Sequence, residues 1–201
     1  MRNGAILIVV ALLGYSPLMA QANSTAGRSG TVSAPALPKA VGNFRLSETS
    51  IFDDPMLGVN YSYSFGRNLH VDVAVQPART LEGGAATADY IVNLAAQSFR
   101  TLSRTTPGGT QDFTIVRDTA DTLLIGSRVV PGHIVAAQIR RGSSAERYHA
   151  WYIYVLGDRY IRVMVQNMGT GAAGPDSQAM REEIEQFVRL IVPSVASAWQ
   201  S

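Results

Sequence analysis

The chain has no cysteine, few histidines and almost no lysine. Its 201 residues include three His, and Lys39 is the only Lys. The lack of cysteine excludes disulfide bonds, thiolate metal sites, cysteine nucleophiles and lipid attachment through a thiol. Net charge is also small, because 17 basic side chains stand against 15 acidic ones. The resulting charge of +2 provides no long-range field for nucleic acid or for an anionic membrane.

Charged residues are scarce as well, at 16% against 46% hydrophobic residues. This balance excludes an intrinsically disordered chain, which combines low hydrophobicity with high net charge. The length predicts one domain. After the first 14 residues no apolar run approaches the roughly 20 residues that span a bilayer, so we expect the mature chain to be soluble.

The N-terminus has the order of a secretory signal peptide: one basic residue, an apolar run and small residues. Arg2 precedes the apolar residues 4–14, and Ala20-Gln21-Ala22 is an A-x-A cleavage pattern. Residues 1–22 are therefore predicted to be removed after Ala22, or alternatively after Ala20. An N-terminal anchor or a buried helix is the other reading. Cleavage predicts a periplasmic or secreted protein.

Residues 23–40 are rich in Ser, Thr, Ala, Gly and Pro and lack a large apolar pattern. Such a segment cannot offset its ordering entropy by burial, so we expect a flexible tether. Residues 41–201 are predicted to form a single globular domain. This length can bury a proper core without covalent cross-links.

Alternating apolar and polar residues predict the first strands of that domain. They run over residues 44–52, 59–65 and 69–75. The link between the last two is the three-residue segment 66–68, because this loop length keeps all apolar side chains on one face. It pairs Phe65 with Leu69 and Tyr63 with Val71.

Helical spacing predicts two helices, at residues 87–102 and 176–192, the second ended or kinked by Pro193. Strands are expected between them at residues 113–117, 122–129, 133–141, 147–156 and 160–166. In the last two strands, the alternation of apolar residues favours a loop with an odd number of residues around Gly157-Asp158. That loop would set Trp151, Ile153 and Val155 beside Ile161, Val163 and Val165.

The element order is thus three strands, one helix, about five strands and one helix. Strands in runs with few helices indicate an α+β fold, with a mainly antiparallel sheet of about six to eight strands and two flanking helices. Over most of residues 41–192 this order resembles the PsbP-like α/β/α group of small exported accessory proteins. The resemblance implies a binding or accessory role, and it supplies no functional residues.

Residues 169–174 read Gly-Thr-Gly-Ala-Ala-Gly, which matches the dinucleotide motif G-x-G-x-x-G. That fingerprint also needs a second parallel strand and an acidic residue about 20 positions later. Neither follows here, so we interpret the segment as a strand-to-helix loop and predict no cofactor. A bound anion at the helix N-terminus is the alternative.

His70 and Asp72 lie two residues apart on one predicted strand, so both side chains point to one face. Such a pair can orient a general base or contribute to a metal site. The other reading is an ordinary solvated polar face. Because metal sites need three or four ligands and neither His133 nor His149 can be placed beside His70, no metal is predicted.

In the last predicted hairpin, aromatic and basic residues occupy the alternate positions that we assign to the side away from the core. Tyr, Met and Arg are enriched in interface cores and hot spots. We therefore predict a recognition surface for a peptide, a glycan or an envelope protein, unless a helix covers this face. Its members are Tyr148, Tyr152, Tyr154, Tyr160, Arg162 and Met164.

These features favour an exported, non-catalytic binding or accessory domain of the bacterial cell envelope. The alternative is a small periplasmic hydrolase that uses His70 and Asp72. A third hypothesis is a folding helper that binds exposed chains. Nucleic acid is excluded as a partner because the predicted surface has no basic stripe.

Overall fold

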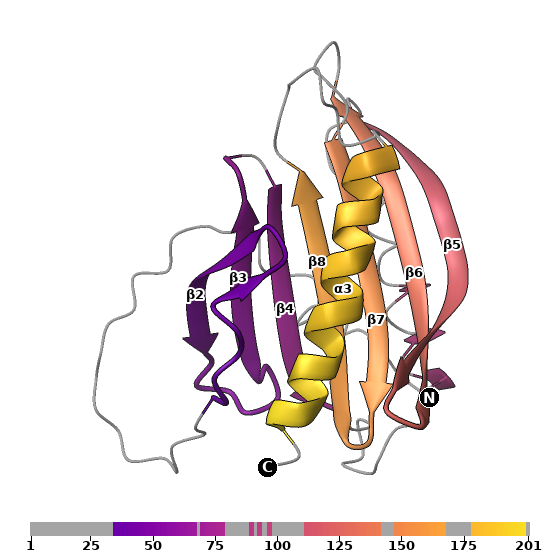
Figure 1. The fold of residues 1–201 in the computed structure, drawn as a ribbon. Helices are drawn as coiled ribbons and strands as arrows, with labels where there is room; N and C mark the ends of the chain where they lie inside the picture. Colours follow the sequence, from indigo (N-terminus) through magenta and orange to yellow (C-terminus); the bar gives the residue numbers. More distant parts are fainter. Residues whose placement is uncertain are drawn as a thin grey trace.

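The computed structural model describes residues 34–67, 69–78, 89–90, 92–93, 96–97, 111–141, 147–167 and 178–199. Its centre is an eight-stranded sheet in which every neighbouring pair is antiparallel, in the order β1-β2-β3-β4-β8-β7-β6-β5. A long helix, α3, lies across one face of this sheet (Figure 1). The bounds are β1 Ala40–Val41, β2 Phe44–Ile51, β3 Val59–Phe65, β4 Leu69–Pro77, β5 Gln111–Ile125, β6 Arg128–Arg141, β7 Arg147–Leu156, β8 Arg159–Asn167 and α3 Gln178–Ala198.

The predicted hairpin of β3 and β4 is confirmed in its register. Phe65 pairs with Leu69 and Tyr63 pairs with Val71, as the three-residue loop requires. Gly66 has φ +60°, a left-handed conformation that glycine adopts without a steric penalty. The alternating pattern was informative here because only one face of these strands is strongly apolar.

The segment between residues 111 and 141 differs from the prediction of three strands. It forms two longer strands, β5 and β6, which meet at a turn where Gly126 has φ +61°. The predicted break before His133 is wrong, because Pro131 and Gly132 lie inside β6. Pro131 pairs with Thr122 of β5, but pairing with β7 begins only at Gly132. Among the described residues Pro131 thus has a neighbouring strand on one side only, which is a position that accepts proline.

The predicted odd loop between β7 and β8 is also wrong. Leu156 pairs with Arg159 across the two residues Gly157 and Asp158, and Gly157 has φ +61°. Trp151 consequently pairs with Met164, and Ile153 pairs with Arg162. The alternation of apolar residues did not indicate the loop length, because β7 is a central strand with apolar side chains on both faces.

One main core lies between the sheet and α3. The Phe187 ring of α3 is 4.5 Å from the Phe44 ring and 5.1 Å from the Tyr63 ring, measured between centroids. Both tyrosines of β3, Tyr61 and Tyr63, are at most 1% exposed. Helix α3 continues through Pro193 to Ala198, so of the two predicted effects of the proline, the end of the helix is wrong.

The opposite face of the sheet carries a second apolar layer. Val92 packs with Ile153 and Val155, and Ala96 packs with Val135 and Ala137. Six residues of the predicted helix 87–102 are described, and all six are helical. The rest of that helix lies outside the described residues, so the second flanking helix stays a prediction within a broadly α+β fold.

Residues 34–41 contact the domain, although the first seven of them belong to the predicted tether. The Tyr61 hydroxyl donates to the Pro35 carbonyl at 2.8 Å, and the Tyr63 hydroxyl donates to the Pro38 carbonyl at 2.9 Å. Leu37 is only 6% exposed. We call residues 34–41 the strap. The apolar Leu37 and the buried tyrosine hydroxyls provide the contacts that composition alone did not reveal. The predicted tether upstream of residue 34 lies outside the described residues.

Candidate functional site

The predicted surface on the last hairpin is not one face. Tyr148, Tyr152 and Tyr154 lie in the main core beneath α3, whereas Tyr160 belongs to the apolar layer on the opposite face. All four tyrosines and Arg162 are at most 6% exposed. The assignment of these residues to a single side away from the core is therefore wrong. The two-residue turn reverses the assumed parity, and the sheet is covered on both faces where they lie.

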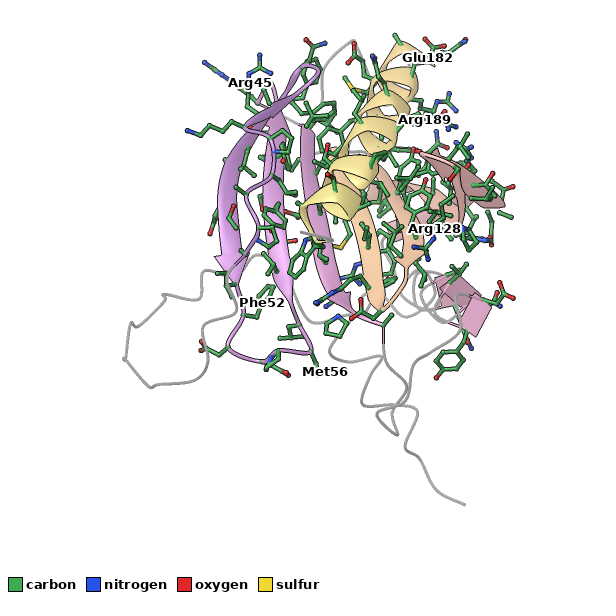
Figure 2. The ribbon with its side chains drawn as sticks, turned by 60° about the horizontal axis from the view of Figure 1, so that its bottom comes forward. Arg45, Phe52, Met56, Arg128, Glu182 and Arg189 are labelled. Atoms are coloured by element: carbon green, nitrogen blue, oxygen red, sulfur yellow. The ribbon has the colours of Figure 1, made fainter. Side chains whose placement is uncertain are left out.

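The tyrosines beneath α3 have packing and hydrogen-bonding roles. The Tyr154 hydroxyl donates to Asp121 Oδ2 at 2.6 Å. Burial raises the pKa of Tyr154, and Asp121 raises it further, because both disfavour the phenolate. Arg189 of α3, labelled in Figure 2, opposes this effect to a smaller extent. The ring of Tyr154 also lies against Gly132 of β6, where only a glycine fits. A Cβ at position 132 would lie 2.4 Å from a carbon of that ring.

Arg162 lies on the opposite face with its guanidinium 4.8 Å from the centre of the Trp151 ring. Stacking of this kind allows a buried guanidinium to contact an aromatic face favourably. Burial raises the pKa of the neighbouring Tyr160, and the positive charge of Arg162 acts against that rise. Arg162 is thus part of a packed aromatic and basic layer.

His70 and Asp72 share a face, as predicted, but the bonds of the carboxylate go elsewhere. Asp72 Oδ1 accepts from Ser62 Oγ at 2.6 Å and from Asn60 Nδ2 at 3.3 Å. In the described part of the chain no hydrogen bond joins His70 to Asp72. The pair therefore lacks the contact through which a carboxylate orients a catalytic imidazole.

The same region brings a second histidine near His70. Gln166 of β8 pairs with His70 on one side and with His149 on the other, so the three residues form one row across the sheet. Strand β8 lies between the two histidines, so they are two strand spacings apart. Among the described residues no group of three His, Asp or Glu side chains could hold a metal ion.

A histidine–carboxylate contact that we did not predict lies at the other end of the sheet. His133 Nε2 is 2.7 Å from Asp118 Oδ1, and the two side chains are 16% and 28% exposed. Asp118 is on β5 and His133 is on β6, so their contact depends on the register of this hairpin. The sequence prediction missed this contact because Asp118 fell between the predicted strands 113–117 and 122–129, so it was not expected to lie beside His133.

The outer edge of β5 is an open feature of the described structure. This strand has 15 residues, and among the described residues β6 is its only partner in the sheet. Four apolar side chains on β5 and β6 are unusually exposed: Ile115 at 37%, Val116 at 45%, Leu124 at 70% and Val129 at 65%. Leu124 and Val129 are cross-strand partners close to the turn between β5 and β6, and Val129 follows Arg128, which is labelled in Figure 2.

The opposite edge of the sheet is better protected. The strap ends in β1, which pairs with Phe44 and Arg45, and the Leu46 amide donates to the Lys39 carbonyl at 3.0 Å. The pairing of β2 with β3 shifts register between Leu46 and Glu48, and such a bulge disfavours further strand pairing. β5 has a similar shift between Ile115 and Arg117, but its regular stretch from Arg117 to Ile125 is longer than that of β2 from Glu48 to Ile51. Of the two edges, β5 therefore offers the longer stretch of unpaired backbone.

The segment with the G-x-G-x-x-G pattern, residues 169–174, lies outside the described residues. None of the helices in the described ranges has the length and apolar character needed to cross a membrane.

No protein-family model matches the sequence, and a comparison with curated proteins finds no relative. Among solved structures, the chain is similar to the solution structure of cyanobacterial PsbP (CyanoP) from Synechocystis sp. PCC 6803. The TM-score is 0.42 with 11% identity, over 84% of this chain and 96% of that one. The similarity concerns the arrangement of elements, and no residue, partner or activity is transferred from it.

Proposed function

We propose that this chain is an exported, non-catalytic accessory domain that binds a protein partner along the edge of β5. The partner contributes an extended segment that adds a strand to the sheet. The observation that carries the proposal is the long outer edge of β5, flanked by exposed apolar side chains and without a neighbouring strand among the described residues.

The backbone chemistry of an edge strand supports this mode of binding. On its outer side such a strand presents a row of N–H and C=O groups that another chain can pair with. Strand addition gains affinity from main-chain hydrogen bonds and specificity from alternate side chains. β5 is paired with β6 along its inner side except at Val116, where the register shifts, so the outer row is presented by a fixed scaffold.

The apolar pair Leu124–Val129 supports a protein as the partner. Exposed branched side chains that lie together favour contact with another apolar surface rather than with water. They are 70% and 65% exposed, and they lie beside the end of β5. A partner strand on β5 would bring its own side chains within reach of Leu124.

Export is part of the proposal, and it rests on the basic, apolar and small-residue order of residues 1–22. The mass of the protein isolated from cells tests it, because cleavage leaves Asn23 or Gln21 as the first residue. A chain that retains Met1 and remains in the cytoplasm contradicts export.

Photo-crosslinking in intact cells tests the binding edge. A photoreactive residue is placed at Thr119 of β5 and, as a matched control, at Thr49 of β2; both threonines are exposed. We expect a discrete protein adduct from position 119, and its loss when Leu124 and Val129 are both changed to Ser. Equal adducts from both positions, or none from position 119, contradict the proposal.

A hydrolase based on His70 and Asp72 has less support. The Asp72 carboxylate is bonded to Ser62 and Asn60 rather than to the imidazole.

A further inference from the structure

We infer that the strand that pairs with β5 is the β5 strand of a second copy of this chain, in antiparallel orientation about a two-fold axis at Thr119. This inference rests on the proposed function, because it names the partner of the same edge. It follows from the sequence of charges along β5 and from the places where its apolar side chains are exposed.

Symmetry first restricts the possible registers. When two identical strands pair antiparallel about a two-fold axis, the residue on the axis faces itself, and residues at equal distances on either side face each other. From Arg117 to Ile125, beyond the register shift at Val116, the residues that point their N–H and C=O groups away from β6 alternate along β5. In an antiparallel pair, two outward-pointing residues must face each other. This happens only when the two-fold axis passes through a residue and not between two residues. The candidate centres are therefore individual residues.

Charge then selects among the centres in the middle of β5. A centre at Arg117, Asp118 or Asp121 places identical charges directly opposite each other, which is destabilising. A centre at Ala120 produces no charge pair. A centre at Thr119 sets Arg117 opposite Asp121, and the symmetry repeats this favourable pair.

Both charged residues are held in place by contacts within one copy. Arg117 forms an ion pair with Glu185 of α3 at 2.5 Å, and Asp121 accepts from the Tyr154 hydroxyl at 2.6 Å. Arg117 remains 38% exposed in its side chain. In the paired arrangement, Asp121 of the second copy adds a negative charge near a guanidinium whose direction is already fixed.

The apolar side chains agree with the same register. Leu124 lies five residues from the axis on one side, and Val116 and Ile115 lie three and four residues from it on the other. Across the two-fold axis, Leu124 of one copy faces Thr114 of the second, and Val116 of the second copy is its diagonal neighbour. Leu124 and Val116 are 70% and 45% exposed in the single chain, so the pairing would remove apolar surface from water at both ends.

The absence of cysteine makes a covalent test unusually clean. In an antiparallel pair, residues directly opposite have Cα atoms about 4.5–5.5 Å apart, which suits a disulfide. The full chain with Thr119→Cys should form a covalent dimer under mild oxidation, and Thr49→Cys should not. A disulfide yield from position 119 no greater than from position 49 overturns the inference.

The mass in solution provides the second test, measured by light scattering over a concentration series. The unmodified chain should show a monomer–dimer equilibrium. Thr119→Lys, which sets two ammonium groups opposite each other, should weaken it by roughly fivefold, and Thr49→Lys should leave it unchanged. A monomeric mass at every concentration overturns the inference. If the chain is monomeric and position 119 still crosslinks another protein in cells, the proposed function stands without self-pairing; if neither occurs, both fail.

Discussion

Substitution of Gly132 by Ala tests the close packing between β6 and β7. An added Cβ would lie 2.4 Å and 2.5 Å from two ring carbons of Tyr154, and 2.7 Å from the Ile153 carbonyl oxygen. The Tyr154 ring has little room to move, because it is 1% exposed and its hydroxyl is bonded to Asp121. The backbone of β7 cannot yield without shifting the sheet. We therefore expect Gly132→Ala to cost about 3 kcal/mol, the upper range for overpacking.

Urea denaturation of the purified chain measures this loss. In a domain of this size, 3 kcal/mol also corresponds to a fall of roughly 6–12 °C in melting temperature. The matched variant is Gly126→Ala, whose Cβ meets nothing within 4 Å but whose φ of +61° carries a cost of only about 1–2 kcal/mol. Gly132→Ala should be less costly once Tyr154 is also changed to Ala, because the double variant removes both ring contacts and leaves only the contact with the Ile153 carbonyl oxygen. A loss below about 1 kcal/mol for Gly132→Ala alone would refute the packing argument.

Three further predictions concern stability. Burial raises the pKa of Tyr61 and Tyr63 to about 12, so the neutral phenols are favoured in the folded state. The contribution of these tyrosines to the free energy of unfolding should be constant below pH 10, and it should fall by at most about 3 kcal/mol per tyrosine between pH 10 and 12. Urea titrations at each pH measure this, and a flat profile contradicts it. A chain that begins at residue 42 should lose about 3 kcal/mol relative to one that begins at residue 34, because Leu37 and Val41 are no longer buried; equal urea midpoints would show that the strap adds nothing. Leu124→Ser should change the free energy of unfolding by no more than about 0.5 kcal/mol, since this side chain is 70% exposed, and a large loss would place it in the core.

The sequence predicted the strands that are apolar on one face and misjudged those that are apolar on both. β3 and β4 alternate clearly, and their register follows from the pattern and the loop length. β7 is covered on both faces, so Tyr152 and Trp151 are equally compatible with an inward position. The two-residue turn at Gly157 then decided which residues face α3, and the sequence pattern did not reveal that choice.

The interaction edge was missed for a related reason. Proline and glycine at positions 131 and 132 normally indicate a turn, and the predicted turn divided one long hairpin into shorter strands. The place of β5 at the end of the sheet depends on β8 pairing with β4, a contact between residues far apart in the chain. Local patterns do not contain that information. The exposure of Leu124 and the His133–Asp118 contact both follow from the observed register.

Crosslinking from Thr119 of β5, compared with crosslinking from Thr49 of β2, tests the central claim most directly. The edge of β5 is the interaction surface in this account, so a discrete adduct should form from position 119 in cells and disappear with the Leu124→Ser and Val129→Ser changes. The adduct should be absent at position 49, where the neighbouring strap and bulge disfavour pairing. Equal crosslinking from the two positions would contradict the account.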